Sequence, residues 1–85
     1  MIAYLFYTKA SPGERQMTAL AAELVRLEVE SELIEADSPR GAHLAEIYDV
    51  TSRPAIVLAA SDGTPIERWQ RQLPVPTDIS YLAHR

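Results

Sequence analysis

The sequence contains no cysteine, only two histidines and only three glycines among its 85 residues. The absence of cysteine excludes disulfide bonds, thiolate zinc sites and cysteine nucleophiles, so any thiol chemistry would need a sulfur atom from another molecule. His43 and His84 are far apart in the chain and show no metal-binding spacing. We interpret both histidines as surface residues, and we assign no metal site.

An excess of positive charge and a long apolar run are also missing. The formal net charge is −4, and the eight lysine and arginine residues are scattered along the chain, which disfavours a nucleic-acid partner. No apolar run approaches the roughly 20 residues that a membrane span needs. Residues 1–7 have neither the basic region nor the cleavage site of a signal peptide. We therefore expect a cytoplasmic protein with no nucleic-acid or membrane partner.

The composition is that of an ordinary globular protein. Apolar residues make up 47% of the chain and charged residues 24%, a balance that supports folding. A chain of this length builds one hydrophobic core rather than two. We expect a single domain over residues 1–85, with no internal repeat or linker.

Hydrophobic patterning predicts a strand, a helix and a second strand in the first part of the chain. Residues 2–8 form a short run of β-branched and aromatic residues, typical of a buried central strand. Ser11, Pro12 and Glu14 have the spacing of a capping box, which begins a helix with apolar residues every three or four positions up to Leu27. Over residues 29–36 the apolar Leu33 and Ile34 lie among acidic residues, which favours an edge strand.

The rest of the chain predicts four further elements. Ser38 and Pro39 repeat the cap-and-proline pattern and predict a short helix that ends near Asp49. Residues 55–60 and 65–71 are two strands separated by a turn sequence, which indicates a hairpin. Thr77 is predicted to cap a closing helix. The order β-α-β-α-β-β-α is typical of an α/β fold with a four-stranded mixed sheet and helices on both faces.

Three stretches of the sequence resemble the thioredoxin and glutaredoxin family. Residues 6–9 resemble the segment before the family's redox loop, whose two cysteine positions then fall on Ser11 and Glu14. Residues 44–58 resemble the family's second helix, its loop and its cis-proline strand, which places the cis-proline on Pro54. Residues 62–70 resemble the final hairpin, although Arg71 or Gln72 replaces a glycine common in the family. The resemblance implies a thioredoxin-like fold of glutaredoxin size.

The resemblance also implies a function. In this family the residue before the cis-proline offers its backbone N–H and C=O groups to an extended peptide or to glutathione, and that residue here is Arg53. Because neither cysteine position holds cysteine, the resemblance implies a redox-inactive adaptor that binds a protein or peptide between the 9–13 loop and the turn before Pro54. No catalytic residue is assigned. The candidate binding residues are Lys9, Ser11, Pro12, Gly13, Arg53, Pro54 and Trp69.

Two alternatives stay open at this point. In the first, the domain binds glutathione or another thiol, and Ser11 replaces the family cysteine as serine does in some glutathione transferases; the capping box is the favoured explanation of Ser11. In the second, the domain associates with itself through a sheet edge or the surface around Trp69, and is a weak homodimer rather than a monomer. Trp69 is also a candidate for an aromatic groove with Tyr7 and Tyr48, although packing is the simpler interpretation.

Overall fold

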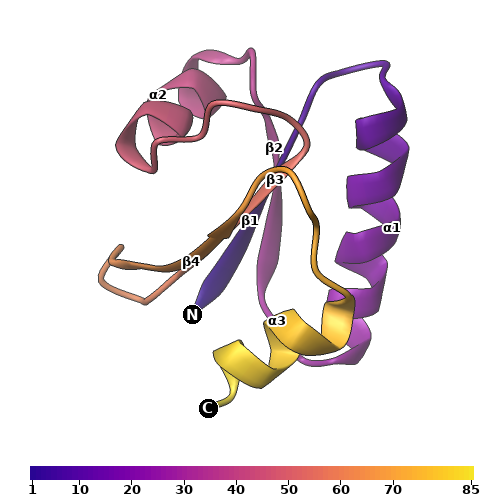
Figure 1. Ribbon diagram of the computed structural model, residues 1–85, viewed down its shortest axis with the longest axis vertical. Helices are drawn as coiled ribbons and strands as arrows, with labels where there is room; N and C mark the ends of the chain where they lie inside the picture. Colours follow the sequence, from indigo (N-terminus) through magenta and orange to yellow (C-terminus); the bar gives the residue numbers. More distant parts are fainter.

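A computed structural model describes all residues, Met1–Arg85, and contains the seven elements in the predicted order (Figure 1). None of its helices is long and apolar enough to cross a membrane. The elements are β1 (Ile2–Tyr7), α1 (Pro12–Arg26), β2 (Ser31–Glu35), α2 (Pro39–Ile47), β3 (Ala55–Ala59), β4 (Pro65–Trp69) and α3 (Pro76–Ala83).

The four strands form one mixed sheet in the order β2-β1-β3-β4. β1 is parallel to β2, with Phe6 opposite Ile34, and antiparallel to β3, with Phe6 opposite Ala55. β3 and β4 form an antiparallel hairpin in which Ile56 lies opposite Trp69. The central position of β1, the edge position of β2 and the hairpin are therefore confirmed.

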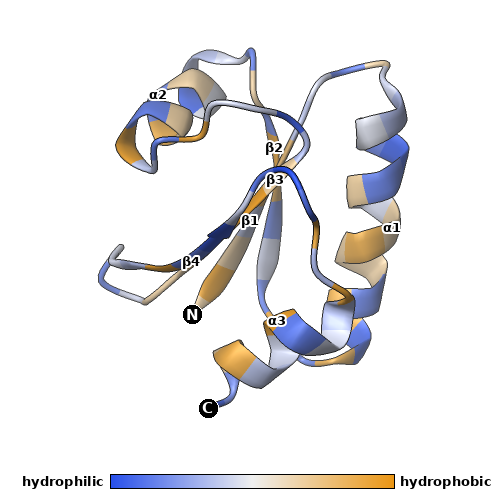
Figure 2. Ribbon diagram, in the orientation of Figure 1, coloured by the Kyte–Doolittle hydropathy of each residue, from blue (hydrophilic) through white to orange (hydrophobic).

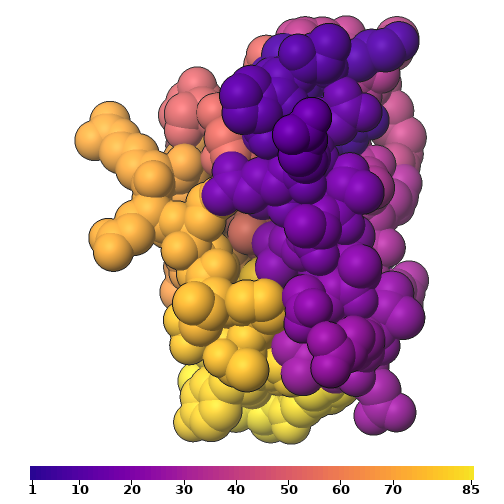
Figure 3. All heavy atoms as spheres, turned by 90° about the vertical axis from the view of Figure 1, so that its right-hand side faces the viewer, coloured from indigo at the N-terminus to yellow at the C-terminus, as the bar shows by residue number.

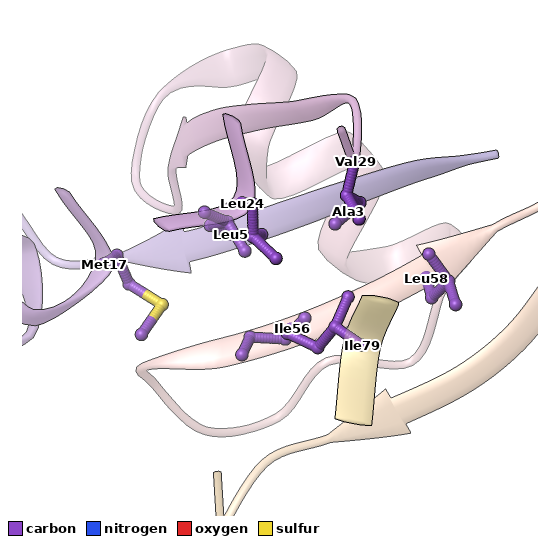
Figure 4. Packing of buried hydrophobic residues seen from close by; sticks show 8 residues of the cluster. All are labelled: Ala3, Leu5, Met17, Leu24, Val29, Ile56, Leu58 and Ile79. Carbon is purple, nitrogen blue, oxygen red and sulfur yellow. The ribbon is translucent and has the colours of Figure 1, made fainter. Parts of the chain in front are cut away.

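Helices cover both faces of the sheet, with α1 and α3 on one face and α2 on the other (Figure 1). Apolar residues are concentrated in the central strands between these layers (Figure 2). The cluster below α1 and α3, shown in Figure 4, consists of Ala3, Leu5, Met17, Leu24, Val29, Ile56, Leu58 and Ile79. The cluster on the α2 side consists of Phe6, Ile34, Tyr48, Ala55, Val57 and Ala59. All five residues of β3 are buried, because the strand contributes to both clusters.

The predicted capping box of α1 is not formed, whereas the predicted cap of α2 is. The Ser38 hydroxyl accepts a hydrogen bond from the Gly41 N–H at 3.0 Å. At α1, however, the Ser11 side chain makes no cap bond to the helix, because its hydroxyl points back and donates to the Thr8 carbonyl oxygen. The Glu14 carboxylate accepts from the Ala10 N–H at 2.7 Å, one residue before the predicted donor.

The predicted start of α3 and the predicted end of β4 also need correction. The N-cap of α3 is Val75, so Thr77 lies within the first turn instead of capping it. Pro76 at the first helical position sets this start, because its φ is already helical and its missing N–H needs no partner. β4 ends at Trp69 rather than at Arg71, because Gln70 leaves the strand to contact the loop before Pro54.

Gly41 allows the close packing of α2 against the end of β2. A Cβ atom at this position would overlap the Glu35 carbonyl oxygen and lie 2.8 Å from the carbonyl carbon. Gly41→Ala should lower the free energy of unfolding by about 3 kcal/mol, because backbone atoms cannot move aside cheaply. Gly13→Ala is the matched control, since its Cβ would lie 3.4 Å from its nearest neighbours, and should change stability by less than about 1 kcal/mol. Equal losses in urea unfolding would contradict this account.

Tyr48 links α2 to the β3–β4 turn, where its hydroxyl donates to the Gly63 carbonyl oxygen at 2.9 Å. Burial raises the pKa of this phenol. The bond therefore contributes fully below the pKa of an unfolded tyrosine, about 10, and is lost as the pH rises through the higher folded pKa. Tyr48→Phe should lower the free energy of unfolding by about 1 kcal/mol at neutral pH. It should also reduce the decline of this free energy at alkaline pH.

Tyr81→Phe is the control for this prediction, because Tyr81 is 68% exposed. Urea unfolding should be measured between neutral pH and about pH 11, a range that spans the ordinary tyrosine pKa. The Tyr81 variant should follow the wild-type protein throughout. If both variants gave the same profile, the assigned role of Tyr48 would be wrong.

Candidate functional site

Gly13 and Pro54 bring together two distant parts of the predicted site. Gly13 is buried in the first turn of α1, where an added Cβ atom would lie 3.4 Å from Cδ of Pro54 and 3.4 Å from Oγ of Ser11. The peptide bond between Arg53 and Pro54 is cis. Three of the predicted residues, Ser11, Gly13 and Pro54, therefore lie side by side at the end of the sheet.

The loop before α1 is fixed by its own hydrogen bonds. Ala10 adopts a left-handed backbone conformation, with φ of 59°, which few residues other than glycine adopt readily. The hydroxyl of Ser11 and the carboxylate of Glu14 both bond to backbone atoms of this loop. Lys9 and Pro12 are exposed, and Lys9 has no ion-pair partner.

An open hollow lies along the outer flank of the first turns of α1. It is lined by Ala10, Ser11, Pro12, Glu14, Arg15, Thr18 and Ala19. Two of the predicted binding residues, Ser11 and Pro12, take part in it, but Arg53 and Pro54 do not. The hollow therefore lies next to the Gly13–Pro54 contact. It is not a groove between the 9–13 loop and the turn before Pro54.

Arg53 offers different groups to the protein and to solvent. Its guanidinium donates to the Asp37 carboxylate at 2.9 Å, which joins the loop before Pro54 to the segment before α2. Ion pairs this exposed contribute about 1 kcal/mol or less. The backbone N–H and C=O of Arg53 have no hydrogen-bond partner within the chain, and the residue is exposed. Arg53 is thus an exposed residue whose two backbone groups are both unpaired.

Gln70 positions the loop that leads to Arg53, although no pattern in the sequence singles it out. Its Oε1 atom accepts hydrogen bonds from the backbone N–H of Thr51 at 2.6 Å and of Ser52 at 3.1 Å. The Thr51 hydroxyl lies 3.2 Å from the same oxygen. One side-chain oxygen thereby satisfies two backbone donors that no strand or helix would otherwise pair.

Arg68 acts in a similar way at the end of α2, and it too has no recognisable sequence motif. Its Nη1 atom donates to the carbonyl oxygens of Tyr48 at 3.1 Å and Asp49 at 3.0 Å. The carbonyl groups at a helix C-terminus are unpaired and carry partial negative charge, which favours a cation there. Arg68 therefore fixes the start of the loop whose other end Gln70 holds.

Trp69 does not form an aromatic groove with Tyr7 and Tyr48. Trp69 and Tyr7 are partly buried and pack against the cluster below α1 and α3. Tyr48 belongs to the cluster on the opposite face of the sheet, where its ring lies 5.8 Å from that of Tyr4. The predicted packing role of Trp69 agrees with this arrangement.

The histidines and acidic residues form no metal-binding group. His43 and His84 are both exposed, as expected of surface residues. The ring of His84 lies 3.0 Å from the Leu27 carbonyl oxygen at the end of α1. No three histidine, aspartate or glutamate side chains are arranged to hold a metal ion.

Comparisons with known proteins extend the description of the fold. No family model and no curated protein matches the chain. A solved structure of a malarial protein is similar over 95% of this chain and 90% of that chain, with a TM-score of 0.72 and 19% sequence identity. The fold is shared. At this identity the likeness concerns the fold alone, so the function has to be argued from the site.

The position of Gln70 predicts that its side chain orders the loop before Arg53. Gln70→Ala should increase amide hydrogen exchange at Thr51 and Ser52 about tenfold, because both N–H groups lose their acceptor. Gln70→Glu should restore protection, since a carboxylate oxygen can accept both bonds. Gln72→Ala is the matched control, because Gln72 is exposed and makes no hydrogen bond. Unchanged exchange in Gln70→Ala would rule out this role.

Proposed function

We propose that this chain is a redox-inactive, thioredoxin-like domain that acts as an adaptor and binds an extended segment of a partner protein through the backbone of Arg53. The order of its elements and the sheet order β2-β1-β3-β4 support the thioredoxin-like assignment. The absence of cysteine supports the lack of redox activity. Lys9, Ser11, Pro12 and Gly13 form one side of the proposed binding surface, and Arg53 and Pro54 form the other.

The free backbone groups of Arg53 carry this proposal. An unpaired N–H and C=O on one exposed residue can pair with the backbone of an extended peptide, which is how peptides add to exposed strands. The loop around Arg53 is already fixed by Gln70 and by the ion pair with Asp37. Binding would therefore cost little additional ordering of the protein.

The hydroxyl of Ser11 argues against the thiol-binding alternative. A serine that replaces cysteine in a thiol site must donate its one hydroxyl proton to the bound thiolate. In this chain the Ser11 proton is donated to the Thr8 carbonyl oxygen. Glutathione binding would require that bond to break, so the peptide-binding function is the better supported one.

The test is an amide NMR titration with a pool of extended peptides and, separately, with reduced glutathione. Peptides should cause saturable shifts at Arg53 and Gly13, whereas the amide of Leu33 on the β2 edge should not move. Saturable shifts with glutathione alone would favour the thiol alternative. Shifts confined to Leu33 would place binding at the sheet edge and contradict the proposal.

The contributions of the Arg53 side chain and backbone to peptide binding can be tested separately. Arg53→Ala keeps the backbone N–H and should retain peptide affinity within about threefold, because an exposed ion pair contributes little. N-methylation of successive peptide residues should abolish binding at the one position whose N–H pairs with the Arg53 carbonyl group, without any change to the protein. Equal affinities across the methylated series would show that backbone pairing is not the mode of binding.

A further inference from the structure

The cations of this chain fall into two groups, those in ion pairs and those that are free. Four of the eight lysine and arginine residues are paired, in Arg26–Glu23, Arg40–Glu32, Arg53–Asp37 and Arg68–Asp49. The remaining cations are exposed and contact no acidic side chain. They are Lys9, Arg15, Arg71 and Arg85.

Three of these free cations lie on segments next to the site proposed for the peptide. Lys9 lies in the loop before Ser11, and Arg15 lines the hollow that includes Ser11. Arg71 directly follows Gln70, which holds the loop before Arg53. The segment after β4, in orange, lies beside α1 in Figures 1 and 3. Arg85 is at the C-terminus, at the opposite end of the molecule (Figure 1).

The acidic residues nearest to the site cancel only part of this positive charge. The Glu14 carboxylate, which accepts the Ala10 N–H at 2.7 Å, keeps its negative charge and offsets one of the three cations, and Asp37 is paired with Arg53. Unpaired carboxylates such as Glu28 and Glu30 follow the far end of α1. A chain of net charge −4 thus carries three of its four free cations on segments next to the proposed site.

We infer that the segment bound at Arg53 is acidic, with carboxylate side chains that contact Lys9, Arg15 and Arg71. This inference rests on the proposed function and specifies the chemistry of its partner. Exposed charges of opposite sign raise the rate of association and select among partners, while backbone hydrogen bonds hold the segment in place. The occupant is an extended, acidic segment of another protein.

Three peptides of the same length test the inference, with glutamate, glutamine or lysine at alternate positions. Their dissociation constants should be measured from the Arg53 amide shift at low salt and at about 0.15 M salt, where charges more than about 8 Å apart are screened. The glutamate peptide should bind at least about fivefold more tightly than the glutamine peptide at low salt. This advantage should shrink at the higher salt concentration, and the lysine peptide should bind most weakly.

Charge-reversal variants locate the contacts on the protein. Arg71→Glu and Arg15→Glu should each lower the affinity for the glutamate peptide about two- to tenfold and leave the affinity for the glutamine peptide unchanged. Arg85→Glu alters the net charge equally and should leave both affinities unchanged. Equal weakening by all three variants would show a general charge effect and overturn the inference.

The outcomes also distinguish this inference from the proposed function. If all three peptides bind with equal affinity and shift the Arg53 amide, the acidic specificity is wrong and peptide binding at Arg53 stands. If no peptide shifts that amide saturably, the proposed function itself fails, and this inference fails with it.

Discussion

The burial of β3 on both faces is the constraint on which the rest of the structure depends. Its five residues, Ala55–Ala59, are all buried and alternate between the cluster below α1 and α3 and the cluster below α2. A strand in this position needs a strand on each side and a helical layer on each face. The three other strands and the three helices supply that environment.

The candidate site follows from the point at which β3 begins. Pro54 directly precedes the strand and packs against Gly13, so the first turn of α1 is held against the loop that enters the sheet. Arg68 and Gln70 extend from the neighbouring strand β4 and its end, and they bond to the two ends of that loop. Arg53 is thereby held in place while its own backbone N–H and C=O stay unpaired.

Local patterns in the sequence predicted the layers of the fold but not all of its details. The apolar run of β1 and the acidic residues of β2 indicated central and edge positions correctly, because burial of side chains determines both the pattern and the place. The capping box predicted at Ser11 is not formed, because the same hydroxyl and carboxylate groups can bond to the preceding loop as well as to the helix. Thr77 does not cap α3, because Pro76 fixes an earlier start of this helix.

The site could be predicted only in part, for a related reason. The proximity of Gly13 to Pro54 followed from the resemblance to a known family. The roles of Gln70 and Arg68 arise from contacts between residues about 20 positions apart, and nothing in the local sequence distinguishes them from ordinary polar residues near a turn. The same holds for the free cations, since pairing depends on which carboxylates the fold brings near.

The most direct measurement of the central claim is the set of nuclear Overhauser contacts between the domain and a bound glutamate-containing peptide. The account predicts contacts from the peptide backbone to the amide of Arg53 and the protons of Gly13 and Pro54, in the pattern of an extended chain. Contacts from the peptide backbone to Leu33 on the β2 edge or to Ile66 on β4, with none to Arg53, would contradict it.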